Sequence, residues 1–152
     1  MEKYILINEN DFQKARNKIR EAKKDETSVI FSSNDDELNR KILEKEKVNI
    51  LLLSLARRKD FIKQRNSGFN QVFAKLAKKN SVSIGINLDE ILATKSLKEK
   101  SEILARVRQN IKLCNKNKLR MDFVSNGNIN KYNLRSLGLT LGMPTWMIGA
   151  LA

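Results

Sequence analysis

The stretch NSGFNQVFAKLAKKNSVSIGI, residues 66–86, changes its apolar period part-way along. Its first part spaces apolar residues as one face of a helix does, with Val72, Phe73 and Leu76 expected to face the core. Its last part is a short apolar run with β-branched residues, which is typical of a buried strand. The stretch therefore predicts a helix that leads into a buried strand. The outward face of that helix then carries Lys75, Lys78 and Lys79.

The same alternation of strand-like and helix-like segments runs along the rest of the chain. Strand-like runs occur at residues 4–7, 28–32, 48–54, 82–88 and 120–125. Amphipathic helical segments separate them, at residues 10–24, 33–47, 70–79 and 96–118. Five β/α units without a low-complexity linker predict a single domain over residues 1–152. Its sheet should be parallel and covered by helices, as either a barrel or an open α/β sandwich.

Polar residues at the start of three predicted helices are types that cap a helix N-terminus. Asn10 is placed to cap the first helix, and the acidic run at residues 35–37 gives the second an N-terminal turn that the helix dipole favours. Ser96 and Glu99 have capping-box spacing at the start of the fourth. The apolar stripe of that fourth helix is Leu104, Val107, Ile111 and Cys114, so the cysteine is interpreted as a core residue.

The formal net charge of +13 lies entirely in the second two thirds of the chain. Residues 1–50 carry 11 Lys and Arg against 11 Asp and Glu, whereas residues 51–152 carry 19 against 6. The excess is densest at residues 57–79, where eight basic residues accompany one acidic residue, Asp60. A solvated protein surface normally mixes both signs, so we expect this segment to bind a polyanion, most simply nucleic acid.

An anionic membrane is the less favoured polyanion. The basic helices are expected to use their apolar faces for the core, which leaves no apolar face to enter lipid. No apolar run approaches the ~20 residues that a membrane span requires, and no signal peptide is recognisable. The single cysteine allows no intramolecular disulfide. A cytoplasmic protein is therefore expected.

Composition also excludes several kinds of active site. The chain has no histidine and one cysteine, which rules out Ser-His-Asp and Cys-His catalysis and zinc sites built on histidine or several thiolates. A carboxylate-only Mg²⁺ site at Asp89 and Glu90 remains open, because both follow a predicted strand at the end where α/β barrels place their active sites. The alternative is that these two residues cap or start a short helical turn.

Three segments together resemble protein component 3 of archaeal ribonuclease P, the family of the thirty-kilodalton human subunit. They are RKDFIKQRNSGFNQVFAKLAKKNSVSIGINLDEIL (58–92), ARVRQNIKLCNKNKLRMDFVSNG (105–127) and NKYNLRSLGLTLGM (130–143). The most recognisable positions are Ser67, Gly68, Asn70, Lys75, Ala77 and Asn80, then Asn110, Lys112, Leu113 and Cys114, then Arg135, Ser136, Leu137, Gly138 and Gly142.

The resemblance implies a TIM-like α/β barrel of repeated β/α units, acting as a non-catalytic subunit of the ribonucleoprotein that removes the 5′ leader of precursor tRNA. In that family the RNA is the catalyst, so no cofactor is expected in this chain and Mg²⁺ serves the RNA. The implied partners are the ribonuclease P RNA, an RRM-like protein subunit and other ribonuclease P proteins, with precursor tRNA contacted indirectly. The alternatives are another RNA-binding or ribonucleoprotein assembly factor and, less favoured, a metal-dependent phosphoesterase.

Basic residues are the expected RNA contacts, and no catalytic or metal-binding residue is expected in the chain. These basic residues are Arg57, Arg58, Lys63, Arg65, Lys75, Lys78, Lys79, Arg108, Lys112 and Arg135.

The chain departs from the family pattern in two places. It begins near the family's second β/α unit and ends soon after LGLTLGM, so the barrel is expected to be shortened or incomplete, with an exposed sheet edge. Several family residues are missing between LRS and LGLTLGM, which puts the helix around Arg135 in question. The apolar segment 143–152, with Trp146, either covers such an edge through a partner subunit or folds over the chain's own core.

Overall fold

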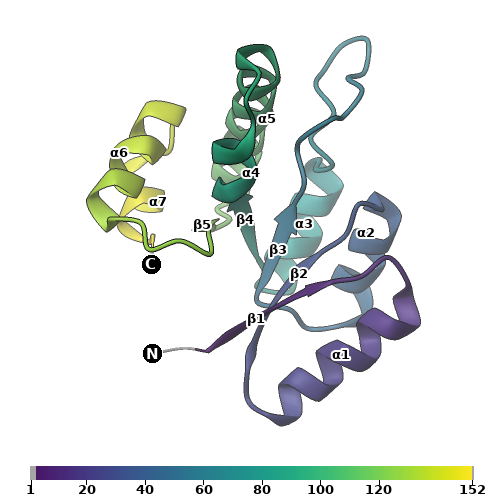
Figure 1. Cartoon of the computed structure of the whole chain (residues 1–152). Helices are drawn as coiled ribbons and strands as arrows, with labels where there is room; N and C mark the ends of the chain where they lie inside the picture. Colours follow the sequence, from purple (N-terminus) through teal and green to yellow (C-terminus); the bar gives the residue numbers. More distant parts are fainter. Residues whose placement is uncertain (1–2, 152) are drawn as a thin grey trace.

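A computed structural model describes residues 3–151 as alternating strands and helices (Figure 1). The strands are β1 (Tyr4–Asn8), β2 (Ser28–Ser32), β3 (Ile50–Leu53), β4 (Ser83–Asn87) and β5 (Met121–Val124). The helices are α1 (Phe12–Lys24), α2 (Asp36–Lys45), α3 (Gln71–Lys79), α4 (Leu88–Ala93), α5 (Leu97–Lys116), α6 (Lys131–Leu141) and α7 (Thr145–Gly149). All five predicted strands and the four predicted helices are confirmed. None of the helices in the described part combines the length and apolarity that a bilayer crossing needs.

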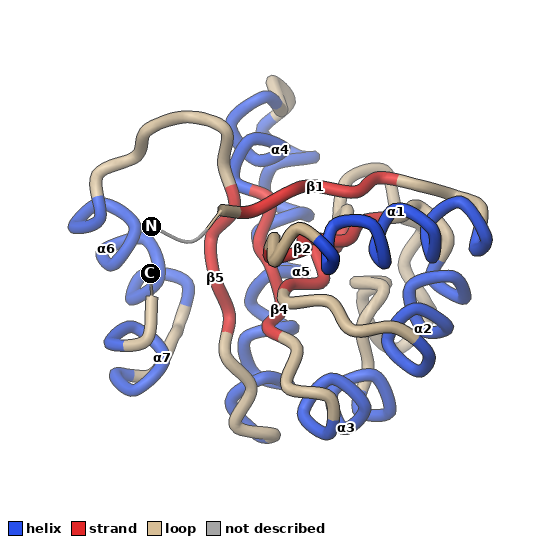
Figure 2. Tube along the Cα trace, turned by 90° about the horizontal axis from the view of Figure 1, so that it is seen from below, coloured by secondary structure: helices blue, strands red, loops and turns tan. Residues whose placement is uncertain are grey.

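The strands form one parallel sheet in the order β1-β2-β3-β4-β5 (Figure 2). Each strand therefore lies beside its predecessor in sequence, which is how consecutive units are arranged in an α/β barrel. Within residues 3–151, β1 pairs only with β2 and β5 only with β4. The expected β/α repetition is confirmed, and the described residues form an open sheet.

The main core lies between the sheet and its helices. Phe31, Leu51 and Ile84, on three neighbouring strands, are fully buried on this face. Ile19 of α1 and Ile42 of α2 pack into the same cluster. Burial of each large apolar side chain stabilises the fold by ~1.5–3 kcal/mol, so this layer holds the helices on the sheet.

The other face of the sheet carries a smaller apolar cluster, made by Ile30, Ile50 and Leu52 with Val124 packed against them. Gly85 of β4 lies between these side chains. A Cβ atom at Gly85 would lie 2.9 Å from Ile50 Cγ2 and 3.0 Å from Leu52 Cδ1. The glycine therefore lets side chains of the flanking strands meet over β4.

An exposed edge of the sheet lies at β1. Tyr4, Ile5 and Leu6 are 46%, 45% and 49% exposed, although the matching run of β2 is buried. Ile7 alone in this strand reaches the main core. The edge expected of an unclosed sheet is therefore present at the first strand.

Two local expectations about helices are wrong. Asp11, not Asn10, caps α1, and Asn10 instead accepts a hydrogen bond from the Ser33 hydroxyl at 2.8 Å. On α3, Val72 is 57% exposed, and Ala77 takes a fully buried position in its place. Small residues fit where a helix lies close to a sheet, and the period alone did not separate them from larger apolar residues.

The C-terminal segment packs on the chain's own core. Met143, Met147 and Leu151 are buried members of the main cluster, so this segment folds over the chain's own core. Gly138 permits the close approach of α7 to α6, because a Cβ atom there would lie 2.7 Å from Ile148 Cδ1. The helix around position 135 is present as α6.

Candidate nucleic-acid interface

A long loop, residues 54–70, joins β3 to α3 and projects from the carboxyl edge of the sheet (Figure 1). This is the edge at which parallel α/β folds place their ligand sites. The loop carries five of the chain's basic residues and one acidic residue, Asp60. These basic residues are Arg57, Arg58, Lys59, Lys63 and Arg65.

Glu90, in the first turn of α4, holds the start of this loop. Its carboxylate accepts hydrogen bonds from the backbone N–H groups of Leu55 at 2.7 Å and Ala56 at 2.9 Å. It also accepts one from the Ser54 hydroxyl at 2.9 Å. With these three hydrogen bonds, the Glu90 carboxylate fixes the backbone where β3 ends.

Asp89 points to the other neighbouring strand and holds the loop that follows β5. It accepts hydrogen bonds from the Ser125 hydroxyl at 2.5 Å and from the Asn126 N–H at 2.8 Å. These bonds, that of Ser125 first, hold the pKa of Asp89 below its ordinary value. Asp89 and Glu90 thus diverge and fix two different loops, and among residues 3–151 no three Asp, Glu or Cys side chains gather as a metal site. The short helical turn that the sequence allowed at this point is α4, capped by Asn87.

Arg106 of α5 holds the middle of the loop from beneath. Its side chain is 2% exposed, and it donates to the carbonyl oxygens of Leu55 and Arg58, each at 2.9 Å. The same guanidinium lies 3.1 Å from an Asp60 carboxylate oxygen. Sequence reasoning missed Arg106, although its spacing was a usable signal: it follows Ile103 by three residues and so lies on the buried stripe of α5.

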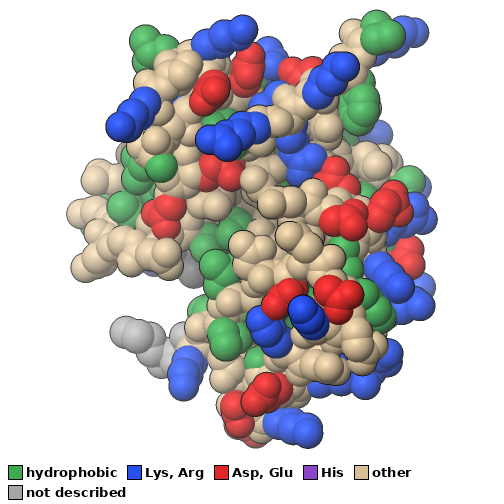
Figure 3. All heavy atoms as spheres, turned by 45° about the vertical axis from the view of Figure 1, so that its right-hand side comes forward, with side chains coloured by type: hydrophobic (Ala, Val, Ile, Leu, Met, Phe, Trp, Pro, Cys, Tyr) green, Lys and Arg blue, Asp and Glu red, His purple; other side chains and the backbone are tan. Residues whose placement is uncertain are grey.

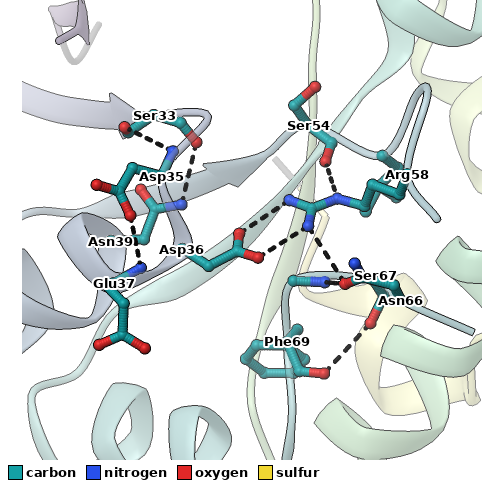
Figure 4. A network of polar contacts seen from close by, with 12 residues as sticks. Ser33, Asp35, Asp36, Glu37, Asn39, Ser54, Arg58, Asn66, Ser67 and Phe69 are labelled. Carbon is teal, nitrogen blue, oxygen red and sulfur yellow. Dashed lines mark hydrogen bonds and ion pairs between the residues drawn. The ribbon is translucent and has the colours of Figure 1, made fainter. Parts of the chain in front are cut away.

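Arg58 also ties the loop to the body of the protein, as Figure 4 shows. Its guanidinium forms a two-point pair with Asp36 of α2, at 2.9 and 3.0 Å. Its Nε donates to the Ser54 carbonyl oxygen at 2.6 Å, and only 11% of the side chain is exposed. The expected RNA contact at Arg58 therefore falls on a side chain that is occupied by internal partners.

Asp60 closes the far side of the loop on itself. Its carboxylate accepts from the Asn66 N–H at 2.8 Å and pairs with Arg65 at 3.1 Å. The Asn66 N–H, followed by Arg106, holds the pKa of Asp60 below its ordinary value. The single acid among these basic residues thus organises the loop's own backbone.

Three basic side chains of the loop remain exposed, and no ion pair within residues 3–151 involves them. They are Arg57, Lys59 and Lys63. At the tip between them, Phe61 is 59% and Ile62 102% exposed. A hydrogen bond from Phe61 N–H to the Gln64 carbonyl oxygen, at 2.9 Å, closes a tight turn there. Figure 3 shows this projection at the top right, with hydrophobic and basic side chains together at its end.

A second part of the basic surface lies over α3 and α5. Lys75 and Lys79 are exposed on α3, and Lys112 is exposed on α5. A groove of ≈ 500 Å³ lies next to Lys112, lined also by Gln64 and Asn70 of the loop, by Gln109 and Lys116 of α5, and by three further residues, none of them acidic. The groove therefore connects the loop to the exposed face of α5.

The remaining predicted contacts are more dispersed. Lys78 is exposed but donates to the Lys118 carbonyl oxygen at 3.0 Å, near the end of α5. Arg108 is exposed and donates to the Thr140 carbonyl oxygen of α6 at 3.2 Å. Arg135 lies half-buried on α6. The structure thus gathers Arg57, Lys63, Arg65, Lys75, Lys79 and Lys112 around the loop and the α3–α5 face, and it places Arg108 and Arg135 at α6 or facing it.

Comparison with known proteins is informative at the level of the fold. A chain in the cryo-EM structure of archaeal ribonuclease P with mature tRNA superposes with a TM-score of 0.76, at 23% sequence identity. The two chains share a fold. The superposition covers 95% of this chain and 62% of that chain, so this chain spans less than two thirds of the other's length. No family model and no curated protein matches the sequence.

Proposed function

We propose that this chain is a non-catalytic, RNA-binding protein subunit of ribonuclease P, which supports the catalytic RNA in removing the 5′ leader of precursor tRNA. The observation that carries the proposal is the shared fold with a chain of archaeal ribonuclease P. The basic loop and the α3–α5 face provide the surface, because phosphate neutralisation by Lys and Arg dominates binding to RNA.

The finer assignment follows the sequence resemblance. The chain corresponds to protein component 3 of a cytoplasmic archaeal enzyme, and its five units are a section of a TIM-like barrel. Its partners are the ribonuclease P RNA, the RRM-like subunit and other ribonuclease P proteins, with precursor tRNA reached through the RNA. Mg²⁺ acts on the RNA component, and this chain needs no cofactor.

The placement of acidic side chains supports a phosphate-binding role. Residues 51–152 contain six acidic residues, and four of them hold loops or arginines within the fold. These four are Asp60, Asp89, Glu90 and Asp122. The exposed lysines of the loop and of α3 therefore face solvent with few neighbouring carboxylates, which is the condition for attracting a polyanion.

A pair of charge-removing variants tests the surface. Arg57 has a backbone φ of 56°, in the region that favours glycine, so Arg57→Gly removes the guanidinium without backbone strain. Combined with Lys63→Ala, it should reduce the salt slope of binding to ribonuclease P RNA by about two, one for each lost charge. The control combines Lys14→Ala and Lys24→Ala on exposed positions of α1. Equal affinity and equal slope in the two double variants would contradict the proposed surface.

Reconstitution tests the role itself. The chain, added with the other ribonuclease P proteins, should let the RNA cleave precursor tRNA at lower Mg²⁺, and the purified chain alone should not cleave it. Mg²⁺-dependent cleavage by the purified chain, lost in Asp89→Asn, would favour the phosphoesterase alternative. Equal binding to unrelated structured RNAs, with no effect on cleavage, would favour a general RNA assembly factor.

A further inference from the structure

A second basic groove lies at the opposite, amino edge of the sheet, where the ends of α3 and α5 meet α7. Its volume is ≈ 470 Å³, and it is lined by three basic residues, one tryptophan and no acidic residue. The basic residues are Lys78, Lys118 and Arg120, and the tryptophan is Trp146. Charge and aromatic surface together are the features of sites for single-stranded nucleic acid.

The Trp146 ring is held in place while part of its surface stays open. Its indole N–H donates to the Asn115 side-chain oxygen at 2.9 Å, which fixes the ring edge to the end of α5. The next residue, Met147, is fully buried and anchors α7 to the core. With 37% of Trp146 exposed, the fixed side chain offers part of its surface to a ligand.

Lys118 is the basic residue of the groove that lies beside the aromatic ring. Its ammonium lies 5.6 Å from the centre of the Trp146 ring, within reach of a cation–π contact. Its backbone φ of 56° lies in the left-handed region, directly after the cap of α5, where glycine or asparagine is the favoured residue. Glu26 after α1 and Ser81 after α3 have the same left-handed φ, so this conformation does not by itself select a lysine at position 118.

The other two basic residues surround the same opening. Lys78 reaches it from α3, where its ammonium donates to the Lys118 carbonyl oxygen at 3.0 Å. The Arg120 side chain is 50% exposed, and its guanidinium lies 3.6 Å from the largely buried carboxylate of Asp122. The three cations therefore line one groove together with Trp146.

We propose that this groove binds one unpaired nucleotide of an RNA, with the base stacked on Trp146 and the adjacent phosphates paired with Lys118 and Arg120. The inference rests on the proposed RNA-binding function and deepens it, because it adds a site for a splayed-out base at the edge of the sheet opposite the 54–70 loop. A single-stranded segment is favoured over a duplex here, since only an unstacked base offers its face to a ring.

The single tryptophan of the chain makes the site directly observable. A single-stranded oligouridylate of about eight nucleotides, within the usual range of site sizes, is titrated into the full chain while tryptophan emission is recorded. Anisotropy of the labelled oligonucleotide measures total binding in parallel. Saturable quenching by the single strand, with weaker quenching by a blunt RNA duplex of equal length, is the expected result.

Lys118→Gly is the decisive variant, because glycine suits its left-handed backbone and the carbonyl that binds Lys78 is kept. It should fold at least as stably as the wild type, bind the oligonucleotide roughly three- to tenfold more weakly and lose about one unit of salt slope. Glu26→Gly is the matched control, since Glu26 has a φ of 53° at the end of α1. It should leave the quenching unchanged.

The outcomes separate this site from the wider proposal. The nucleotide site is wrong if anisotropy shows binding while tryptophan emission does not change. It is also wrong if Lys118→Gly is quenched as strongly as the wild type. In both cases the proposed RNA binding is still supported. Failure to bind any RNA removes the proposed function as well. Quenching by an acidic peptide or an added ribonuclease P protein, but not by RNA, overturns the site in favour of a protein contact.

Discussion

Arg106 and Asp60 join the centre of α5 to the 54–70 loop, with the guanidinium of Arg106 3.1 Å from a carboxylate oxygen of Asp60. Arg106 is 2% exposed at its side chain and Asp60 is 31% exposed, so the pair spans the boundary between core and solvent. The pair therefore anchors the loop that carries the exposed lysines Lys59 and Lys63.

Replacement of Arg106 by leucine should release this loop. The variant keeps apolar packing but leaves the Leu55 and Arg58 carbonyl oxygens without their donor. Asp60 loses its contact with Arg106 and keeps those with Asn66 and Arg65. We expect the free energy of unfolding to fall by about 3 kcal/mol, in the range for buried polar groups that lose their partners, measured by urea denaturation. Arg108→Leu, at an exposed position of the same helix, should change it by less than about 0.5 kcal/mol. Equal losses would show that Arg106 does not anchor the loop.

The basic segment shows what sequence could and could not predict. Periodicity and charge located the helices, the strands and the 57–79 segment, because these depend on residues near one another in the chain. They treated Arg58 and Lys63 alike. Arg58 is bound by Asp36, 22 positions earlier in the chain, whereas Lys63 is exposed. Such a division depends on tertiary contacts, which a local pattern does not encode.

The same limit applies to the carboxylates and to the core. Asp89 and Glu90 are adjacent in sequence, and only the order of the strands explains why one holds the loop after β5 and the other the loop after β3. Val72 fits a helical stripe by period, but the close approach of α3 to the sheet favours Ala77 at the buried position. Buried arginine is uncommon, so the sequence alone does not predict Arg106 as a core residue.

The apolar tip of the loop predicts a second RNA-binding effect. Phe61→Ser with Ile62→Ser removes two exposed apolar side chains, and the turn is kept because its hydrogen bond is between backbone atoms. We expect weaker binding to ribonuclease P RNA with an unchanged salt slope, since stacking on Phe61 and apolar contact with Ile62 would contribute without releasing counterions. Filter binding over a salt series measures both quantities. Leu97→Ser, at an exposed position starting α5, is the control. If the tip variant binds the RNA as tightly as this control, the tip does not contact the RNA.

The Asp89 hydrogen bonds predict a pH dependence of stability. Because the pKa of Asp89 is held below its ordinary value of 3.8, first by Ser125, the ionised form stabilises the fold above that value. This stabilisation is lost as the pH falls through the folded pKa. The difference in unfolding free energy between wild type and Asp89→Asn should therefore be full near neutrality and shrink in acid. Ser125→Ala should flatten the wild-type profile in the same way, and parallel profiles for wild type and Asp89→Asn would contradict the assignment.

Burial of Met147 predicts that the C-terminal segment is part of the chain's own core. The side chain is fully buried with Met143 and Leu151, so Met147→Ala leaves a cavity and should lower the free energy of unfolding by about 2–4 kcal/mol. Urea denaturation of the isolated chain measures the loss. Leu139→Ala, at a position 56% exposed on α6, should cost less than about 1 kcal/mol. If removal of residues 144–152 leaves the melting temperature unchanged but abolishes association with an RRM-like subunit, the segment serves a partner instead, because only a segment outside the core can be lost without cost to the monomer.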